Sequence, residues 1–185
     1  MKLTAKLTGL MMFAALALCA QAPAPTVAKI MDNQLATIER ELVPLVEAIP
    51  ADKMGFAPTQ GEFKGARTFA QQATHTAAVV YAVAASALGE KNPIDMGKNE
   101  NGPATIKTKA EVLDFVKAAF AYGHKATAAL TEKNMTEMMQ SPFGSGKIPR
   151  LSAVSIAVWH SFDHYGQMAV YARMNGIVPP ASRGQ

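Results

Sequence analysis

The segment 68–88 constrains the fold more than any other part of the chain, because it is long and carries no charge. No Asp, Glu, Lys or Arg stands between Arg67 and Glu90, and Gly89 follows the segment as a typical helix-ending residue. The first half holds Gln, Thr and His, and only residues 77–88 are predominantly apolar, about half the length that a bilayer needs. We therefore expect a helix that other helices surround, in the interior of a bundle rather than in a membrane.

Three other segments, 27–49, 108–139 and 152–175, repeat apolar residues every three or four positions, which predicts amphipathic helices. Thr108 and Glu111 form a capping box at the start of the second of these. Gly176, followed by Pro179 and Pro180, ends the last. No strand pattern is found. The sequence predicts an all-α protein, a four-helix bundle in one domain over 27–182, with long loops at 50–64 and 90–107.

The first twenty residues have the pattern of a secretory signal peptide. Lys2 and Lys6 precede an apolar run over 7–18, which ends in small residues and is too short to span a bilayer. We expect cleavage after Ala20, a short linker at 21–26 and export to the periplasm or the medium, without a stable membrane anchor. Lipid attachment at Cys19 is the less favoured alternative.

Charge and cysteine content exclude several classes of function. The formal charge is +4, but two of the positive charges belong to Lys2 and Lys6, and basic residues do not cluster with aromatic ones. A nucleic-acid partner is therefore not expected. The one cysteine, Cys19, lies in the segment expected to be removed. The mature chain then has no thiol nucleophile and no disulfide.

Histidines are the candidate metal ligands. His160 and His164 are four residues apart, so their rings leave one helix face about one turn apart. Such a pair alone is more often an accident than a site. His75 lies on the uncharged helix and is expected to face inward, so it can meet the pair across the bundle. Three neutral imidazoles with one open position are typical of a catalytic metal site. His124 is interpreted as a rim or surface residue.

Two further side chains flank the pair. Asp163 lies at the edge of the face that carries His160, where it can orient a ligand histidine or form an outward ion pair. Gln167 lies one turn further along, where a hydrogen bond to a metal-bound water and a simple core hydrogen bond are equally compatible with the pattern.

Three stretches together resemble the DinB family of small four-helix metalloproteins: Phe-Ala-Gln-Gln-Ala-Thr-His at 69–75, Trp-His-Ser-Phe-Asp-His-Tyr-Gly-Gln at 159–167, and Met-Asn-Gly-Ile-Val-Pro-Pro-Ala-Ser at 174–182. The resemblance implies that His75, His160 and His164 bind one divalent metal ion, either zinc, nickel or iron. It also implies a bundle whose helices do not simply alternate up and down, for which the two long loops provide the crossovers.

The resemblance implies more than one activity. Some relatives resemble transferases that act on small thiols, and others resemble thiol-dependent isomerases. Small thiols are scarce in an oxidising compartment, so export favours a hydrolytic reaction as strongly as thiol transfer. We expect an exported metal-dependent transferase or hydrolase, and the alternative is a non-catalytic metal-binding or structural bundle. The expected partners are a small-molecule substrate, with a thiol among the candidates, and a second copy of the chain.

Overall fold

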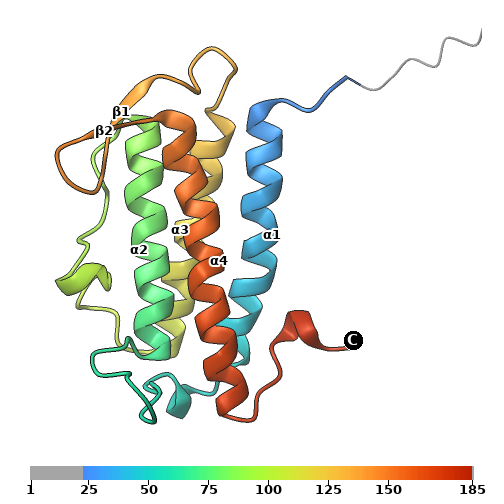
Figure 1. The fold of residues 1–185 in the computed structure, drawn as a ribbon, viewed down its shortest axis with the longest axis vertical. Helices are drawn as coiled ribbons and strands as arrows, with labels where there is room; N and C mark the ends of the chain where they lie inside the picture. The colour runs from blue at the N-terminus through green and yellow to red at the C-terminus, as the bar shows by residue number, and fades with distance from the viewer. Residues whose placement is uncertain (1–22, 185) are drawn as a thin grey trace, which may run out of the picture.

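Four long helices lie side by side in the computed structural model, which describes residues 23–184 (Figure 1). They are α1 (Val27–Ala48), α2 (Phe69–Leu88), α3 (Lys109–Ala128) and α4 (Arg150–Met174). Two three-residue strands, β1 (Met138–Gln140) and β2 (Lys147–Pro149), pair antiparallel in a small hairpin. Short 3-10 turns lie at η1 (Ala51–Lys53), η2 (Lys98–Glu100) and η3 (Pro180–Ser182). The predicted all-α four-helix bundle is confirmed, with the hairpin as a minor addition.

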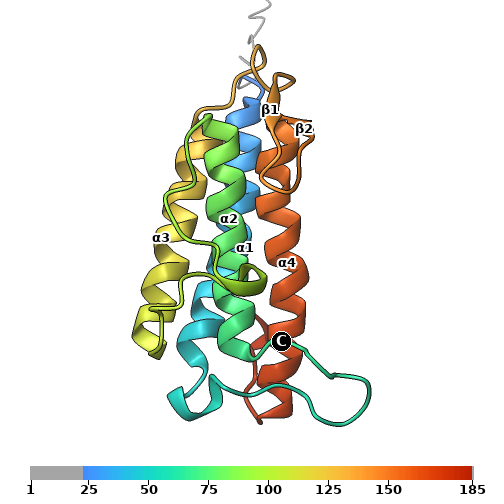
Figure 2. The same cartoon turned by 90° about the vertical axis from the view of Figure 1, so that its left-hand side faces the viewer.

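The bundle contains one crossover. Helices α1 and α4 run in one direction and α2 and α3 in the other, so the segment between α2 and α3 must return along the length of the bundle (Figures 1 and 2). Figure 2 shows this segment in front of α2. The loop at 50–64, by contrast, stays at one end, where the backbone N–H groups of Phe69 and Ala70 donate to the carbonyls of Phe56 and Met54. Only the second of the two long loops therefore crosses.

Helix α2 is buried on nearly all sides, because α3 and α4 pack against it and the crossing segment covers part of what remains. Thr68 and Gln71 form a capping box at its start, and Gly89 ends it in the left-handed conformation that glycine favours. Helices α1 and α2 lie on opposite corners, and each contacts α3 and α4. The arrangement places α2 and α4 side by side and antiparallel, which decides where their histidines meet.

The predicted helix over 108–139 is too long by eleven residues, because α3 ends at Ala128. Thr131 and Asn134 exchange side-chain and backbone hydrogen bonds, and the amide of Asn134 donates to the carbonyl of Ala129. These bonds compete with the helical pattern and stop it. Met138 and Met139, expected at the end of the helix, instead belong to β1, whose pairing with β2 no sequence pattern predicted.

The other predicted helix limits differ from the observed ones by two residues or fewer. Within residues 23–184, no helix is long and apolar enough to cross a membrane. The predicted signal peptide and the first two residues of the linker at 21–26 lie outside the described residues.

Candidate metal centre

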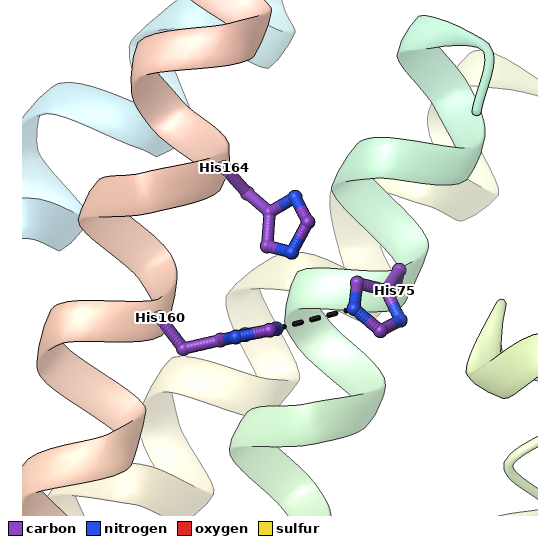
Figure 3. Close-up of side chains that lie close together, drawn as sticks. All are labelled: His75, His160 and His164. Atoms are coloured by element: carbon purple, nitrogen blue, oxygen red, sulfur yellow. Dashed lines mark hydrogen bonds between the residues drawn. The ribbon is translucent and has the colours of Figure 1, made fainter. Parts of the chain in front are cut away.

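Three histidines from two helices converge in the middle of the bundle. His75 comes from α2, and His160 and His164 come from successive turns of α4 (Figure 3). One ring nitrogen of each lies within 4.8 Å of the corresponding nitrogen of the other two, and the Nε2 atoms of His75 and His160 are 3.2 Å apart. His75 and His160 are 85 residues apart in the chain, and they meet because α2 and α4 are neighbours. His75, His160 and His164 are called the histidine cluster below.

Backbone and side-chain carbonyl groups fix the protons of two of the three rings. The Nδ1 of His75 lies 2.9 Å from the carbonyl oxygen of Glu100, and the Nδ1 of His164 lies 2.5 Å from Oε1 of Gln72. A carbonyl oxygen only accepts hydrogen bonds, so both Nδ1 atoms carry the proton. Both Nε2 atoms therefore keep a free lone pair, which is the state that a metal ligand requires.

Burial keeps the histidine rings uncharged. It lowers the pKa of His160 to about 4 and that of His164 to about 3, and the neighbouring histidines add to both shifts. Burial also lowers the pKa of His75, although the hydrogen bond to Glu100 opposes this. Three neutral imidazoles at neutral pH offer lone pairs without first losing protons.

The donor set fits a divalent transition metal. Imidazole nitrogens suit zinc, iron, nickel and copper, whereas calcium and magnesium prefer oxygen ligands. Two nitrogens bound to one tetrahedral zinc ion lie about 3.3 to 3.4 Å apart, from Zn–N lengths of about 2.0 to 2.1 Å. The 3.2 Å separation of the His75 and His160 nitrogens is close to this value. Three protein ligands also leave a coordination position for a substrate or water.

Gln167 and Asp163 lie behind the histidine cluster, but neither forms a hydrogen bond with a histidine among the contacts of the described residues. The Nε2 of Gln72 donates to Oε1 of Gln167 over 2.9 Å, and the Nε2 of Gln167 donates to Oδ2 of Asp163 over 3.3 Å. His164 is therefore connected to Asp163 through two amides. Sequence reasoning missed Gln72, although its position three residues before His75 places it on a neighbouring part of the same helix face.

The carbonyl of Glu100, which accepts the hydrogen bond from His75, belongs to a strained loop. Asn99 and Glu100 both have left-handed backbones, with φ of 56° and 59°, which non-glycine residues rarely adopt. Arg67 holds this loop, since its Nε donates to Oδ1 of Asn101 over 2.7 Å and its Nη2 donates to the carbonyl of Asn99 over 2.8 Å. Strain of this kind costs about 1–3 kcal/mol per residue and is common at functional sites. Here the strained backbone directs the carbonyl of Glu100 toward His75.

His124 lies elsewhere, between α3 and α1. Its Nδ1 is 2.6 Å from Oδ1 of Asp32 and its Nε2 is 3.0 Å from Oε2 of Glu39. Burial opposes the charged ring, but the two carboxylates outweigh it and raise the pKa of His124 above its ordinary value. The hydrogen bond from His124 is also the main reason that the pKa of Asp32 is lowered, with Lys29 a smaller contribution. His124 thus links two helices and is not part of the histidine cluster.

The link between His124 and α1 predicts a pH-dependent stability. A raised folded-state pKa stabilises the protein below the unfolded value of about 6.5, and this contribution is lost as the pH rises through the folded-state value. We expect His124→Gln to lower the free energy of unfolding by about 1 kcal/mol or less at pH 5.5, since about a third of each side chain is exposed. The difference from the wild type should shrink at pH 9. Urea unfolding at both pH values measures it, and an equal difference at both would contradict the ionic interpretation.

The histidine cluster is reached through a cavity of about 370 Å³ that His160 lines together with Ile156, Trp159 and Phe143. Trp159 is 57% exposed although it is aromatic, and Phe143 comes from the loop between β1 and β2. The wall beside His160 is therefore mostly apolar and open to small molecules.

Comparisons with known proteins agree with this architecture. A crystal structure of a DinB-like protein from Bacillus cereus ATCC 10987 has a similar fold, with a TM-score of 0.62 and 17% identity over 81% of this chain and 93% of that one. No curated protein matches the sequence. The DinB superfamily matches residues 34–168, which include all three histidines of the cluster. The chain belongs to the DinB superfamily.

Proposed function

We propose that this protein holds one divalent metal ion on His75, His160 and His164 and uses it to catalyse a reaction of a small molecule. The observation that carries the proposal is the orientation of the rings. Two of them have their protons fixed on Nδ1 by carbonyl oxygens, so that free Nε2 lone pairs meet in the cluster.

A bound ion of this type would act as a Lewis acid and lower the pKa of a water or thiol that coordinates to it. The chain's own groups hold and orient the ligands: Glu100 and Gln72 fix the tautomers of His75 and His164. Trp159 and Ile156 line the approach to His160 with apolar surface. No cysteine occurs among residues 23–184, so the nucleophile must come from the substrate or from water.

Two reaction types are compatible with this arrangement. Transfer of a small thiol to an electrophile follows from the similarity to DinB-family transferases, and hydrolysis follows from the expected export to a compartment in which thiols are scarce. The two differ in their need for added thiol, which makes them separable by experiment.

Turnover by the metal-loaded protein tests the proposal. Elemental analysis of protein purified without added metal should give about one divalent ion per chain. An electrophilic thiol acceptor, with and without added 2-mercaptoethanol, should be compared with a panel of esters and amides. We expect turnover in one of these assays that His160→Gln abolishes and His124→Gln retains. Absence of turnover in every assay, with metal fully bound, would contradict catalysis and support a non-catalytic metal-binding bundle.

Export is a separate part of the proposal and rests on the pattern of residues 1–20. We expect the secreted or periplasmic protein to begin at Gln21, which intact mass spectrometry measures directly. A mass that retains residues 1–19 would contradict export by signal cleavage, and a diacylglyceryl adduct on Cys19 would replace it with a lipoprotein.

A further inference from the structure

A second cavity, of about 770 Å³, lies next to the histidine cluster. It opens between the start of α2, the later turns of α4 and the crossing segment, and Gln72 and Gln167 form part of its wall. Since Gln72 also accepts the hydrogen bond from His164, one side chain separates this cavity from the cluster. We call it the Arg67 cavity, after the one charged residue in its lining.

The polar lining of the Arg67 cavity consists mainly of amide side chains whose oxygens are already engaged. The five amides are Gln71, Gln72, Asn99, Asn101 and Gln167. Oε1 of Gln71 accepts from the backbone of Thr68, and Oδ1 of Asn101 accepts from Arg67. The oxygens of Gln72 and Gln167 accept from His164 and from Gln72, respectively. Within residues 23–184 the side-chain N–H groups of Gln71 and Asn101 have no acceptor, and Gln72 and Gln167 each use one of their two, so all four amides keep N–H groups to offer a ligand.

Arg67 offers donors of the same kind. Its two hydrogen bonds, from Nε and Nη2, use one side of the guanidinium and hold the group in place. The end of the guanidinium, with both N–H groups of Nη1 and the second of Nη2, has no hydrogen-bond partner within residues 23–184. Two parallel N–H groups at this end match the two oxygens of a carboxylate.

No carboxylate neutralises this charge. Neither Asp nor Glu lines the Arg67 cavity, and Arg67 forms no ion pair with the described residues. The start of α2 lies at the same place and adds the positive end of a helix dipole. A half-buried cation surrounded by donors is stabilised when an anion occupies the cavity.

We infer that the Arg67 cavity binds the carboxylate group of a small molecule, which Arg67 holds end-on while the free amide N–H groups surround it. One planar fork and neutral donors suit a carboxylate better than a phosphate dianion, which usually recruits several cations. The inference deepens the proposed function, and it rests on that function in taking the histidine cluster as the place where the same molecule reacts.

Gln72 connects the two sites, because it lines the Arg67 cavity and its Oε1 lies 2.5 Å from Nδ1 of His164. The aromatic rings of Phe63 and Tyr171 line the same cavity and provide apolar contact for the remainder of a ligand. A carboxylate-bearing substrate can therefore extend from Arg67 toward the cluster past Gln72.

Isothermal titration of the protein, as purified, with two probes of the same shape tests the inference. The probes are 3-phenylpropionate and its neutral amide, 3-phenylpropionamide. We expect the carboxylate to bind at least tenfold more tightly than the amide. Arg67→Gln should remove this preference, Arg67→Lys should retain part of it, and Lys64→Gln, which removes an exposed cation outside this cavity, should leave it unchanged.

The probe pair separates loss of the anchor from damage to the loop that Arg67 holds. Loss of the anchor weakens only the carboxylate, whereas a damaged cavity weakens both probes equally, and the second result would overturn the inference. Equal binding of the two probes by the wild type would also overturn it.

The same titrations of the His160→Gln variant distinguish failure of this inference from failure of the proposed function. A carboxylate preference that His160→Gln abolishes and Arg67→Gln retains would place the carboxylate on the metal ion, and it would overturn the inference while supporting the metal site. A preference retained in His160→Gln and lost in Arg67→Gln supports the inference whether or not the protein is a metal enzyme.

Discussion

Replacing any one of the three clustered histidines should remove most of the metal affinity. For His75→Gln, His160→Gln and His164→Gln we expect the affinity for zinc to fall by more than about 100-fold, since loss of a supporting hydrogen bond alone costs about 10- to 100-fold at such sites. Each substitution deletes one of three nitrogens that lie within 4.8 Å of one another. Competition with a chromophoric chelator measures the affinity of each variant.

The supporting residues give a graded control for this series. Gln72→Leu keeps all three ligands but removes the acceptor of His164, so we expect an intermediate loss within the 10- to 100-fold range. His124→Gln should leave the affinity unchanged, because His124 contacts Asp32 and Glu39 instead of the cluster. An equal loss in His124→Gln would show that metal binds to the protein surface rather than to the cluster.

A methyl group at Gly97 should disturb both the fold and the site. Gly97 has φ of 66° and ψ of −176°, a conformation open essentially to glycine alone, and a Cβ there would lie 2.0 Å from the carbonyl oxygen of Gly102. The backbone must therefore move. We expect Gly97→Ala to lower the free energy of unfolding by about 2–3 kcal/mol or to open the loop locally, by the usual cost of such strain.

The same substitution should weaken metal binding although no ligand changes. The turn that starts at Gly97 holds Glu100, whose carbonyl fixes the proton of His75. Hydrogen exchange of the Gly102 amide, which donates to the carbonyl of Met96 over 2.8 Å, reports whether the turn opens. We expect faster exchange together with about a tenfold loss of zinc affinity, as for other lost supporting hydrogen bonds.

Gly144→Ala is the matched control. Gly144 also has a positive φ, of 83°, but its Cβ would meet no atom within 4 Å. Only the conformational cost of about 1–2 kcal/mol then remains, and the cluster should bind zinc as in the wild type. If Gly97→Ala behaved like Gly144→Ala in both measurements, the turn would not be what holds Glu100 against His75.

Much of the fold could be predicted from local patterns. The uncharged segment 68–88 identified a helix that must be surrounded, and the capping residues Thr68 and Thr108 identified two helix starts. The error at 129–139 has a local cause as well, because the side chains of Thr131 and Asn134 bind the backbone where the apolar pattern alone predicted further helix. Apolar spacing records which side of a helix is buried, but it does not show where side chains interrupt the helix.

Part of the candidate site could also be predicted from the sequence, and part could not. The spacing of His160 and His164 on one helix face is a property of the sequence, and so is the inward position of His75 on a helix that lacks charge. Gln72 could have been included on the same argument. The carbonyl of Glu100 could not, because every residue has one, and only the left-handed turn held by Arg67 aims this one at His75.

The sequence by itself determined the four helices, the burial of α2 and the identity of the three histidines, because these depend on residue type and on spacing within one helix. The tertiary structure alone decided that α2 and α4 are neighbours and that the crossing segment covers His75. It also decided that four amide oxygens beside Arg67 accept hydrogen bonds while each of these amides keeps at least one N–H group without an acceptor within residues 23–184. These properties depend on contacts between residues far apart in the chain, and such contacts form only when the crossover has set which helices lie side by side.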